Sequence, residues 1–116
     1  MTLTIPKKER IKKTYDYKRA YGEGRRYHGD YIILFALNNN LNYSRVGISV
    51  GKKIGGSVKR NRVKRLIREV VRHIWGGIGK ERDLVLVVKR EAVGIDLKLL
   101  WMDIEKVFKK AGLLIK

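Results

Sequence analysis

The chain has 116 residues, the size of one ordinary domain, and 44% of them are hydrophobic, which is enough to build a core. Its 28 lysines and arginines face only 11 acidic residues, so the formal net charge of +17 cannot be neutralised within the chain and predicts a polyanionic partner, most simply a nucleic acid. The absence of cysteine excludes disulfides, thiolate catalysis and cysteine-ligated zinc.

Residues 1–13 form a basic segment that we expect to be a mobile arm. The first residues are too few and too soon charged for a signal peptide, and no apolar run is long enough to cross a bilayer. These features predict a cytoplasmic protein of one domain with no membrane partner. Thr14 is placed to cap a short helix from Tyr15 to Tyr21, and Gly22 is placed to end it.

Two extended segments follow. Turn-like residues 22–29 lead into an apolar run over residues 31–37, and an asparagine-rich turn, residues 38–42, leads into an alternating strand over residues 45–50. Side chains alternate between the two faces of a strand. One face of the first run is therefore predicted to carry Tyr31, Ile33 and Phe35.

Glycines at positions 51, 55 and 56 break the second strand, and Ser57 is placed to cap a long helix that runs to about Trp75. At about 100° per residue, one arc of this helix is apolar and predicts a buried side. Its members are Val63, Leu66, Ile67, Val70, Val71 and Ile74.

The opposite arc of the long helix and the loop before it are basic, and they contain one acid, Glu69. A solvated helix face usually alternates charges of both signs, which this one does not. We interpret it as a surface that meets successive phosphates, with an asparagine that could reach a sugar or a base edge. This set of residues comprises Lys52, Lys53, Lys59, Arg60, Asn61, Arg62, Lys64, Arg65, Arg68 and Arg72.

Residues 83–88 are apolar without alternation, which predicts an inner strand covered on both faces, and Asp96 is placed to cap a last amphipathic helix that Gly112 ends. Two large amphipathic helices need one sheet face to cover. The short first helix cannot cover the other face, so we expect a partly open groove there.

Aromatic side chains are predicted near that groove, and two interpretations remain. They are core filler, or they form a platform on which unpaired bases stack, with basic side chains nearby for the phosphates. We favour the platform, because a fully buried tyrosine hydroxyl would need a partner. The aromatics are Tyr17, Tyr21, Tyr31 and Phe35, and the flanking cations are Lys18, Arg19, Arg25 and Arg26.

Other motifs are weak. Gly51 and Gly56 have the spacing of a phosphate-binding loop, but Ser57 stands where the lysine of that loop must be, and residues 76–79 read as a helix stop rather than a KH-type clamp. The histidines are far apart and the aspartates do not cluster, so nothing local predicts a nuclease that gathers its own metal ions.

Residues 45–55, Arg-Val-Gly-Ile-Ser-Val-Gly-Lys-Lys-Ile-Gly, and residues 58–68, Val-Lys-Arg-Asn-Arg-Val-Lys-Arg-Leu-Ile-Arg, closely resemble the signature of the bacterial ribonuclease P protein subunit. The resemblance covers most of residues 10–110. It implies an α/β (α+β) two-layer sandwich over residues 1–116, with a four-stranded mixed sheet and three helices in the order αβββαβα. It also implies the fold type of ribosomal protein S5 domain 2, with a left-handed βαβ crossover, against the usual right-handed rule.

The resemblance further implies a protein that assists a catalytic RNA in removing the 5′ leader of precursor tRNA. The RNA would cut and would hold most of the magnesium ions, the chain alone would be inactive, and we expect one protein with one RNA. Any metal site on the chain is unknown from the sequence, and ions held jointly with a nucleic-acid phosphate stay open. Arg60-Asn61-Arg62 corresponds to the stretch that contacts the RNA subunit. The leader cleft corresponds to Tyr17, Tyr21, Ile33 and Phe35, with Lys89 and Arg90 near its rim, and Lys18 and Tyr31 are added to it from the residue pattern.

Three other functions are weighed against this one. A ribosomal or general RNA-binding protein would bind folded RNA whether or not a leader is present. A metal-dependent nuclease would cleave by itself, and a DNA-compacting protein would not prefer RNA over duplex DNA.

Overall fold

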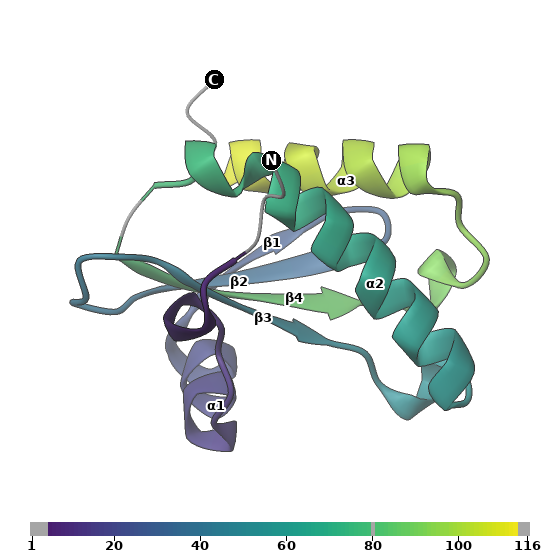
Figure 1. The fold of residues 1–116 in the computed structure, drawn as a ribbon, viewed down its shortest axis with the longest axis horizontal. Helices are drawn as coiled ribbons and strands as arrows, with labels where there is room; N and C mark the ends of the chain where they lie inside the picture. The colour runs from purple at the N-terminus through teal and green to yellow at the C-terminus, as the bar shows by residue number, and fades with distance from the viewer. Residues whose placement is uncertain (1–4, 80, 114–116) are drawn as a thin grey trace.

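The structure is a computed structural model that describes residues 5–79 and 81–113. At its centre is a four-stranded mixed sheet with the strand order β1-β2-β4-β3 (Figure 1). The strands are β1 (Arg25–His28), β2 (Ile32–Asn38), β3 (Arg45–Ser49) and β4 (Arg82–Val88). β2 pairs antiparallel with β1 and with β4, whereas β3 pairs parallel with β4 at the other edge.

Three α-helices cover the sheet unequally (Figure 1). α2 (Ser57–Ile74) and α3 (Leu97–Lys110) lie on one face, and α1 (Thr14–Glu23) lies on the other. Between residues 14 and 110 the strands and α-helices follow one another in the order αβββαβα, which confirms the predicted two-layer α+β fold. β3 and β4 are joined through α2, so the chain has the predicted βαβ crossover.

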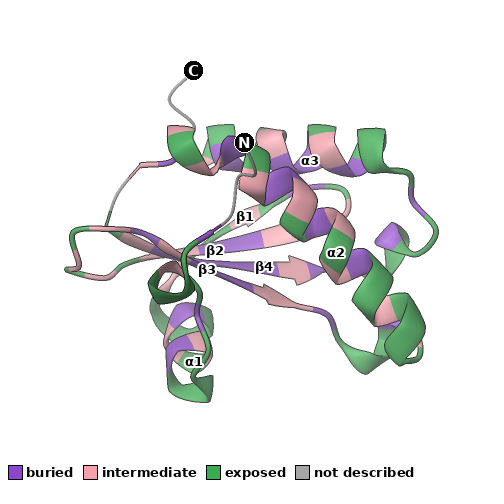
Figure 2. Ribbon diagram, in the orientation of Figure 1, coloured by how far each residue is buried: buried purple, intermediate pink, exposed green. Residues whose placement is uncertain are grey.

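The main core fills the space between the sheet and the pair α2 and α3, where most buried segments lie (Figure 2). The apolar arc predicted for the long helix points there, with Val70 and Val71 fully buried. The cluster under α1 is much smaller. Its buried members are Ile11, Ala20, Phe35 and Val85. The face under α1 is thus the less covered one, as the lengths of the amphipathic helices predict.

Two predicted helix caps are wrong. Thr14 and Ser57 are the first helical residues, and the positions before them, Lys13 and Gly56, make no side-chain cap hydrogen bond. α1 also continues through Gly22 to Glu23, because a single glycine near a helix end is tolerated. The third predicted cap is confirmed, since the Asp96 carboxylate accepts a hydrogen bond from the Leu99 amide at 2.9 Å.

The segment predicted as turn-like, residues 22–29, contains the edge strand β1. Its sequence, Arg-Arg-Tyr-His, has no apolar alternation, and of these four residues only Tyr27 packs against the main core. Pairing with the strong strand β2 makes it a strand. Tertiary context overrides a weak local preference here.

The predicted position of Tyr31 is also wrong. β2 begins at Ile32, and Tyr31 packs against the main core rather than beside Ile33 and Phe35. The cause is the carboxylate of Asp103 in α3, which accepts hydrogen bonds from the amides of residues 30, 31 and 32 at 2.7, 2.8 and 3.0 Å. This capture of three successive amides takes Tyr31 out of the regular alternation.

The described part of the basic arm predicted for residues 1–13 packs against the fold. Residues 7–9 form a short 3-10 turn, and Ile5 and Ile11 are buried. The Ile11 amide donates a hydrogen bond to the Val46 carbonyl at 2.8 Å, so the segment lies along the outer edge of β3. Residues 1–4 lie outside the described residues.

Candidate nucleic-acid interface

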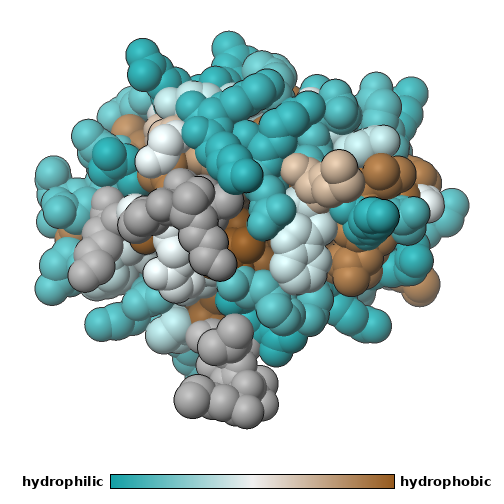
Figure 3. Space-filling model, turned by 90° about the horizontal axis from the view of Figure 1, so that it is seen from above, coloured by the Kyte–Doolittle hydropathy of each residue, from teal (hydrophilic) through white to brown (hydrophobic). Residues whose placement is uncertain are grey.

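The first part of the interface is the outer side of α2 and the 3-10 turn η2 (Lys52–Ile54) before it. All ten polar residues predicted for this surface lie on it, seven of them exposed and Arg60, Lys64 and Arg72 half-buried. Hydrophilic side chains dominate the side of the molecule shown in Figure 3. The structure therefore brings the predicted set together on one helix and its N-terminal loop.

These cations have little internal neutralisation. Arg72 pairs with Glu69 at 2.7 Å, and in residues 5–79 and 81–113 no other member of the set has a carboxylate within 4.0 Å. The Nε of Arg60 is enclosed by protein and has no hydrogen-bond partner among the described residues. An enclosed donor without a partner is costly to the fold.

The second part is the sheet face under α1. Two rows of paired residues cross it, Phe35 with Val85 and Ile33 with Val87. α1 covers the first row, where Ala20 is fully buried and the Tyr21 ring meets the Phe35 ring edge-on at 5.2 Å. The second row is only half-buried and is flanked by exposed or half-buried residues on the outer strands.

The two tyrosines of α1 differ in exposure. Tyr21 is 41% exposed, with its ring centroid 6.5 Å from that of Tyr17. Tyr17 is half-buried over Gly47, where a Cβ would lie 2.6 Å from the tyrosine oxygen. Its hydroxyl donates a long, 3.4 Å hydrogen bond to the Ile11 carbonyl. Burial, and after it the neighbouring Tyr21, raises the pKa of Tyr17.

The predicted leader residues are thus only partly assembled. Tyr17, Tyr21 and Ile33 share this face, and Lys18 is exposed on α1. Phe35 is on the correct face but is buried beneath Tyr21, so it supports the face rather than offering a ring to a base. Tyr31 lies with the main core.

The two predicted rim cations follow β4. Lys89 donates a 2.7 Å hydrogen bond from Nζ to the Gly29 carbonyl, and Arg90 is exposed at the start of the 3-10 turn η4 (Arg90–Ala92). The loop that holds Lys89 is fixed in turn by Asp103, whose carboxylate would meet a Cβ at Gly29 at 2.6 Å. A glycine is needed here because the carboxylate approaches the backbone so closely.

A buried ion-pair network, which was not predicted from the sequence, anchors α1 to the sheet. The Arg45 guanidinium of β3 binds Asp83 of β4 through two hydrogen bonds of 2.9 and 2.6 Å, and it approaches Asp16 of α1 at 3.4 Å. Asp83 is fully buried and also accepts a 2.9 Å bond from the Asn39 side chain. The bonds to Asp83 are the main reason that the pKa of Arg45 is raised above its ordinary value.

A charged residue at the start of an apolar strand could have indicated this network. Asp83 begins the run over residues 83–88 and Arg45 begins the strand before α2, but their pairing depends on the parallel register of β3 and β4.

In residues 5–79 and 81–113, no group of three or more histidine, aspartate or glutamate side chains is placed to hold a metal ion. No helix in those ranges is both long and apolar enough to cross a membrane.

The amino-acid sequence is similar to those of known proteins. A family model described as Ribonuclease P matches residues 5–112. The ribonuclease P protein component of Natranaerobius thermophilus is 43% identical over 106 residues, covering 91% of this chain and 92% of that protein. That of Clostridium novyi is 40% identical over 111 residues, covering 94% and 98%.

Solved structures agree. The RNase P protein of Staphylococcus aureus superposes with a TM-score of 0.84 at 31% identity, covering 91% of this chain and 97% of that one. The RNase P protein of Thermotoga maritima superposes with a TM-score of 0.81 at 27% identity, covering 88% and 96%. The chain therefore shares its fold with these two proteins.

Proposed function

Because the chain belongs to the ribonuclease P protein family, we propose that α2 and η2 bind the catalytic RNA of ribonuclease P while the sheet face under α1 binds the 5′ leader of precursor tRNA. In this proposal one protein joins one RNA in the cytoplasm. The RNA holds the magnesium ions and breaks the phosphodiester bond, and the protein alone is inactive.

The observation that carries the proposal is the one-signed surface of α2. A row of cations that acids of the same chain do not neutralise destabilises a fold by self-repulsion unless a polyanion binds it. Arginines three and four residues apart on a helix can each donate two hydrogen bonds to successive phosphates.

The leader assignment rests on the half-open row of Ile33 and Val87 beside the exposed ring of Tyr21. A single strand binds where an aromatic or apolar surface accepts bases and nearby cations accept phosphates. Lys18 is exposed on α1, and Lys89 follows directly after β4, the strand that carries Val87. The protein would then contribute positioning of the substrate and neutralisation of charge rather than chemistry.

The first test of the proposal reconstitutes the chain with a bacterial catalytic RNA and follows 5′ maturation of precursor tRNA at near-physiological magnesium. We expect Arg60→Ala with Arg62→Ala to weaken binding of the catalytic RNA and to reduce the slope of its salt dependence by about one for each phosphate that is no longer neutralised. Lys98→Ala with Lys109→Ala removes the same charge from exposed positions of α3 and serves as the control. Equal effects of the two pairs would reject a specific surface on α2.

The second test concerns the leader. Tyr21→Ala should weaken binding of precursor tRNA to the holoenzyme about tenfold and leave mature tRNA unaffected, because stacking of one base on an aromatic ring is worth about 1–3 kcal/mol. Tyr15→Ala on the same helix, 68% exposed, is the control. Equal weakening for precursor and mature tRNA would indicate a general RNA-binding protein. Cleavage by the chain and magnesium without RNA would indicate a nuclease.

A further inference from the structure

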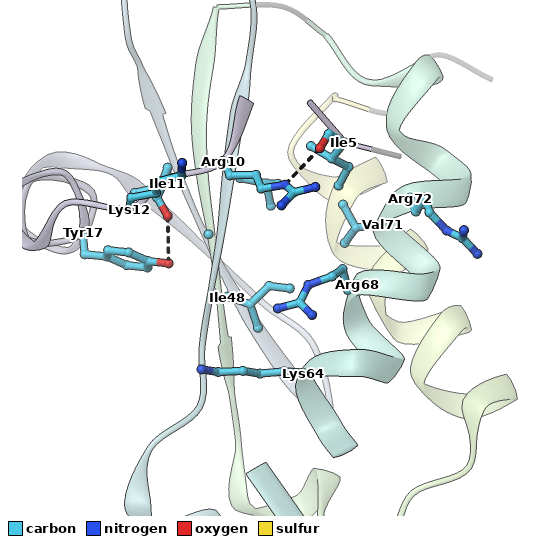
Figure 4. Close-up of a pocket in the computed structure, with 12 residues that line it drawn as sticks. Ile5, Arg10, Ile11, Lys12, Tyr17, Ile48, Lys64, Arg68, Val71 and Arg72 are labelled. Atoms are coloured by element: carbon cyan, nitrogen blue, oxygen red, sulfur yellow. Dashed lines mark hydrogen bonds between the residues drawn. The ribbon is translucent and has the colours of Figure 1, made fainter. Parts of the chain in front are cut away.

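A groove of about 320 Å³ runs along the outer edge of β3, between residues 5–12 and α2 (Figure 4). Part of its lining is aliphatic: Ile5, Ile11, Val46, Ile48 and Val71. The rest includes Gly47 and Tyr17 and five cations: Arg10, Lys12, Lys64, Arg68 and Arg72. None of the lining residues is acidic. The groove therefore combines an apolar wall with a positive rim.

Three of the cations extend into this space. Figure 4 shows Lys64 and Arg68 reaching from α2 toward β3 and Ile48, and Arg10 reaching in from the N-terminal segment. Arg10 is held by a 2.9 Å hydrogen bond from its Nε to the Ile5 carbonyl, which leaves the other guanidinium nitrogens for a ligand. Arg72 is engaged by Glu69 at 2.7 Å and points away from the space, so we assign it no role in binding there.

We propose that this groove binds one unpaired nucleotide of the catalytic RNA, with the base against Ile48 and Val71 and its phosphate between Lys64, Arg68 and Arg10. The proposal rests on the function proposed above. The positive rim selects an anion, and the aliphatic wall would be of no use to a phosphate ion by itself. Proteins commonly bind unpaired RNA nucleotides by taking the splayed base against an apolar or aromatic surface.

The size of the groove limits the ligand. About 320 Å³ lies at the lower end of the range for small-molecule sites, about 300–1,000 Å³, so it suits a single nucleotide and excludes a duplex. The catalytic RNA is the source that we assign, because Lys64 and Arg68 continue the surface of α2. The row proposed for the leader, Ile33 and Val87, belongs to the cluster under α1, whereas Ile48 and Val71, the proposed contacts of the base, pack with the main core.

The direct test uses the full chain and uridine 5′-monophosphate, followed by methyl NMR. We expect the nucleotide to shift the methyl signals of Ile11, Ile48 and Val71, and inorganic phosphate at the same concentration to leave those of Ile48 and Val71 in place. Lys64→Gln with Arg68→Gln should weaken the nucleotide at least tenfold. Lys98→Gln with Lys109→Gln, the matched control on α3, should not. Shifts confined to Ile33 and Val87, or equal weakening by both pairs, would overturn the proposal.

A second variant tests the groove in the holoenzyme. Ile48→Trp fills the space without changing charge, and it should weaken binding of the catalytic RNA about tenfold while the ratio of precursor to mature tRNA affinity stays constant. A changed ratio would make the leader the occupant and overturn the assignment. Should this variant unfold, as monitored by circular dichroism, the nucleotide titration of Lys64→Gln with Arg68→Gln tests the groove by itself.

The two proposals fail in different ways. Nucleotide binding at Ile48 in a chain that does not assemble with the catalytic RNA would refute the proposed function and leave the groove as a nucleotide site. Stimulated cleavage by a holoenzyme in which a folded Ile48→Trp chain binds the catalytic RNA as tightly as the wild type would refute the groove and leave the proposed function, because Ile48 is not part of the surface of α2.

Discussion

The surface of α2 and the sheet face under α1 are both proposed to bind RNA, yet they are built in opposite ways. The first is made by helical periodicity within residues 52–72, and its side chains contribute little to the fold. The second joins segments far apart in the sequence: Arg45 ties Asp16 to Asp83, and Asp103 holds the loop at residues 29–31. A surface made locally should tolerate substitution, whereas a face made by distant contacts should lose stability.

The largest expected difference between the two regions is in the free energy of unfolding. Arg45→Ala leaves the fully buried Asp83 without its cation, which should cost about 3 kcal/mol, the lower end of the range for breaking a buried ion pair, since Arg45 keeps a side-chain exposure of 19%. Arg62→Ala makes the same substitution on α2, where it is exposed, and should change stability by about 0.5 kcal/mol or less. Urea denaturation measures both.

The comparison would fail if the two arginine variants were destabilised to a similar extent. A small effect of Arg45→Ala would mean that water or Asn39 satisfies Asp83 without the guanidinium. A large effect of Arg62→Ala would mean that the surface of α2 takes part in the fold after all.

A smaller effect is expected where α1 rests on the sheet. A Cβ at Gly47 would lie 2.6–2.8 Å from the ring and oxygen of Tyr17, so Gly47→Ala must displace this tyrosine. Overpacking of this kind costs about 1–3 kcal/mol. The same change at Gly51, where nothing lies within 4 Å of an added Cβ, is the control.

A double-mutant cycle isolates this contact. In a Tyr17→Ala background, Gly47→Ala should cost little, because the clash has been removed, so the two changes should be clearly non-additive. Additive effects would show that Gly47 is needed for another reason and that the position of α1 does not depend on the contact.

The difference between a surface made by local periodicity and a face made by distant contacts also explains how much could be predicted from the sequence. The apolar arc of α2, its basic side, the cap at Asp96 and the order of elements depend on short-range patterns or on the family signature, and the structure confirms them. The face under α1 was predicted only in part. Tyr31 was assigned to it because strand periodicity cannot reveal that Asp103, 72 residues later, captures the Tyr31 amide.

The ion-pair network and the groove were missed for a related reason. The sequence shows that Arg45 is a charged residue in a strand, but its partner depends on the register between β3 and β4. The groove requires the N-terminal segment to lie along β3, and its basic composition predicted an arm free of the fold instead. Two isoleucines, at positions 5 and 11, were the available signal that this segment is partly buried.

The smallest expected effect concerns the Tyr17 hydroxyl, which connects α1 to the N-terminal segment. Its hydrogen bond to the Ile11 carbonyl is long, at 3.4 Å, so Tyr17→Phe should cost less than about 1 kcal/mol near neutral pH. The pH dependence is more telling. Burial raises the pKa of Tyr17 above its ordinary value of 10.0, so on raising the pH the unfolded chain loses this proton before the folded chain does.

Stability should therefore fall as the pH rises from about 10 toward the raised pKa of the folded state, because there the folded state holds more protons than the unfolded state. Tyr17→Phe removes this contribution, so the wild type should lose stability relative to the variant as the pH rises above about 10. Tyr15→Phe, at a 68% exposed position of the same helix, is the control for the loss of a tyrosine hydroxyl. Parallel pH profiles for wild type and Tyr17→Phe would mean that Tyr17 is open to water, and α1 would then be less firmly seated on the sheet than the packing over Gly47 indicates.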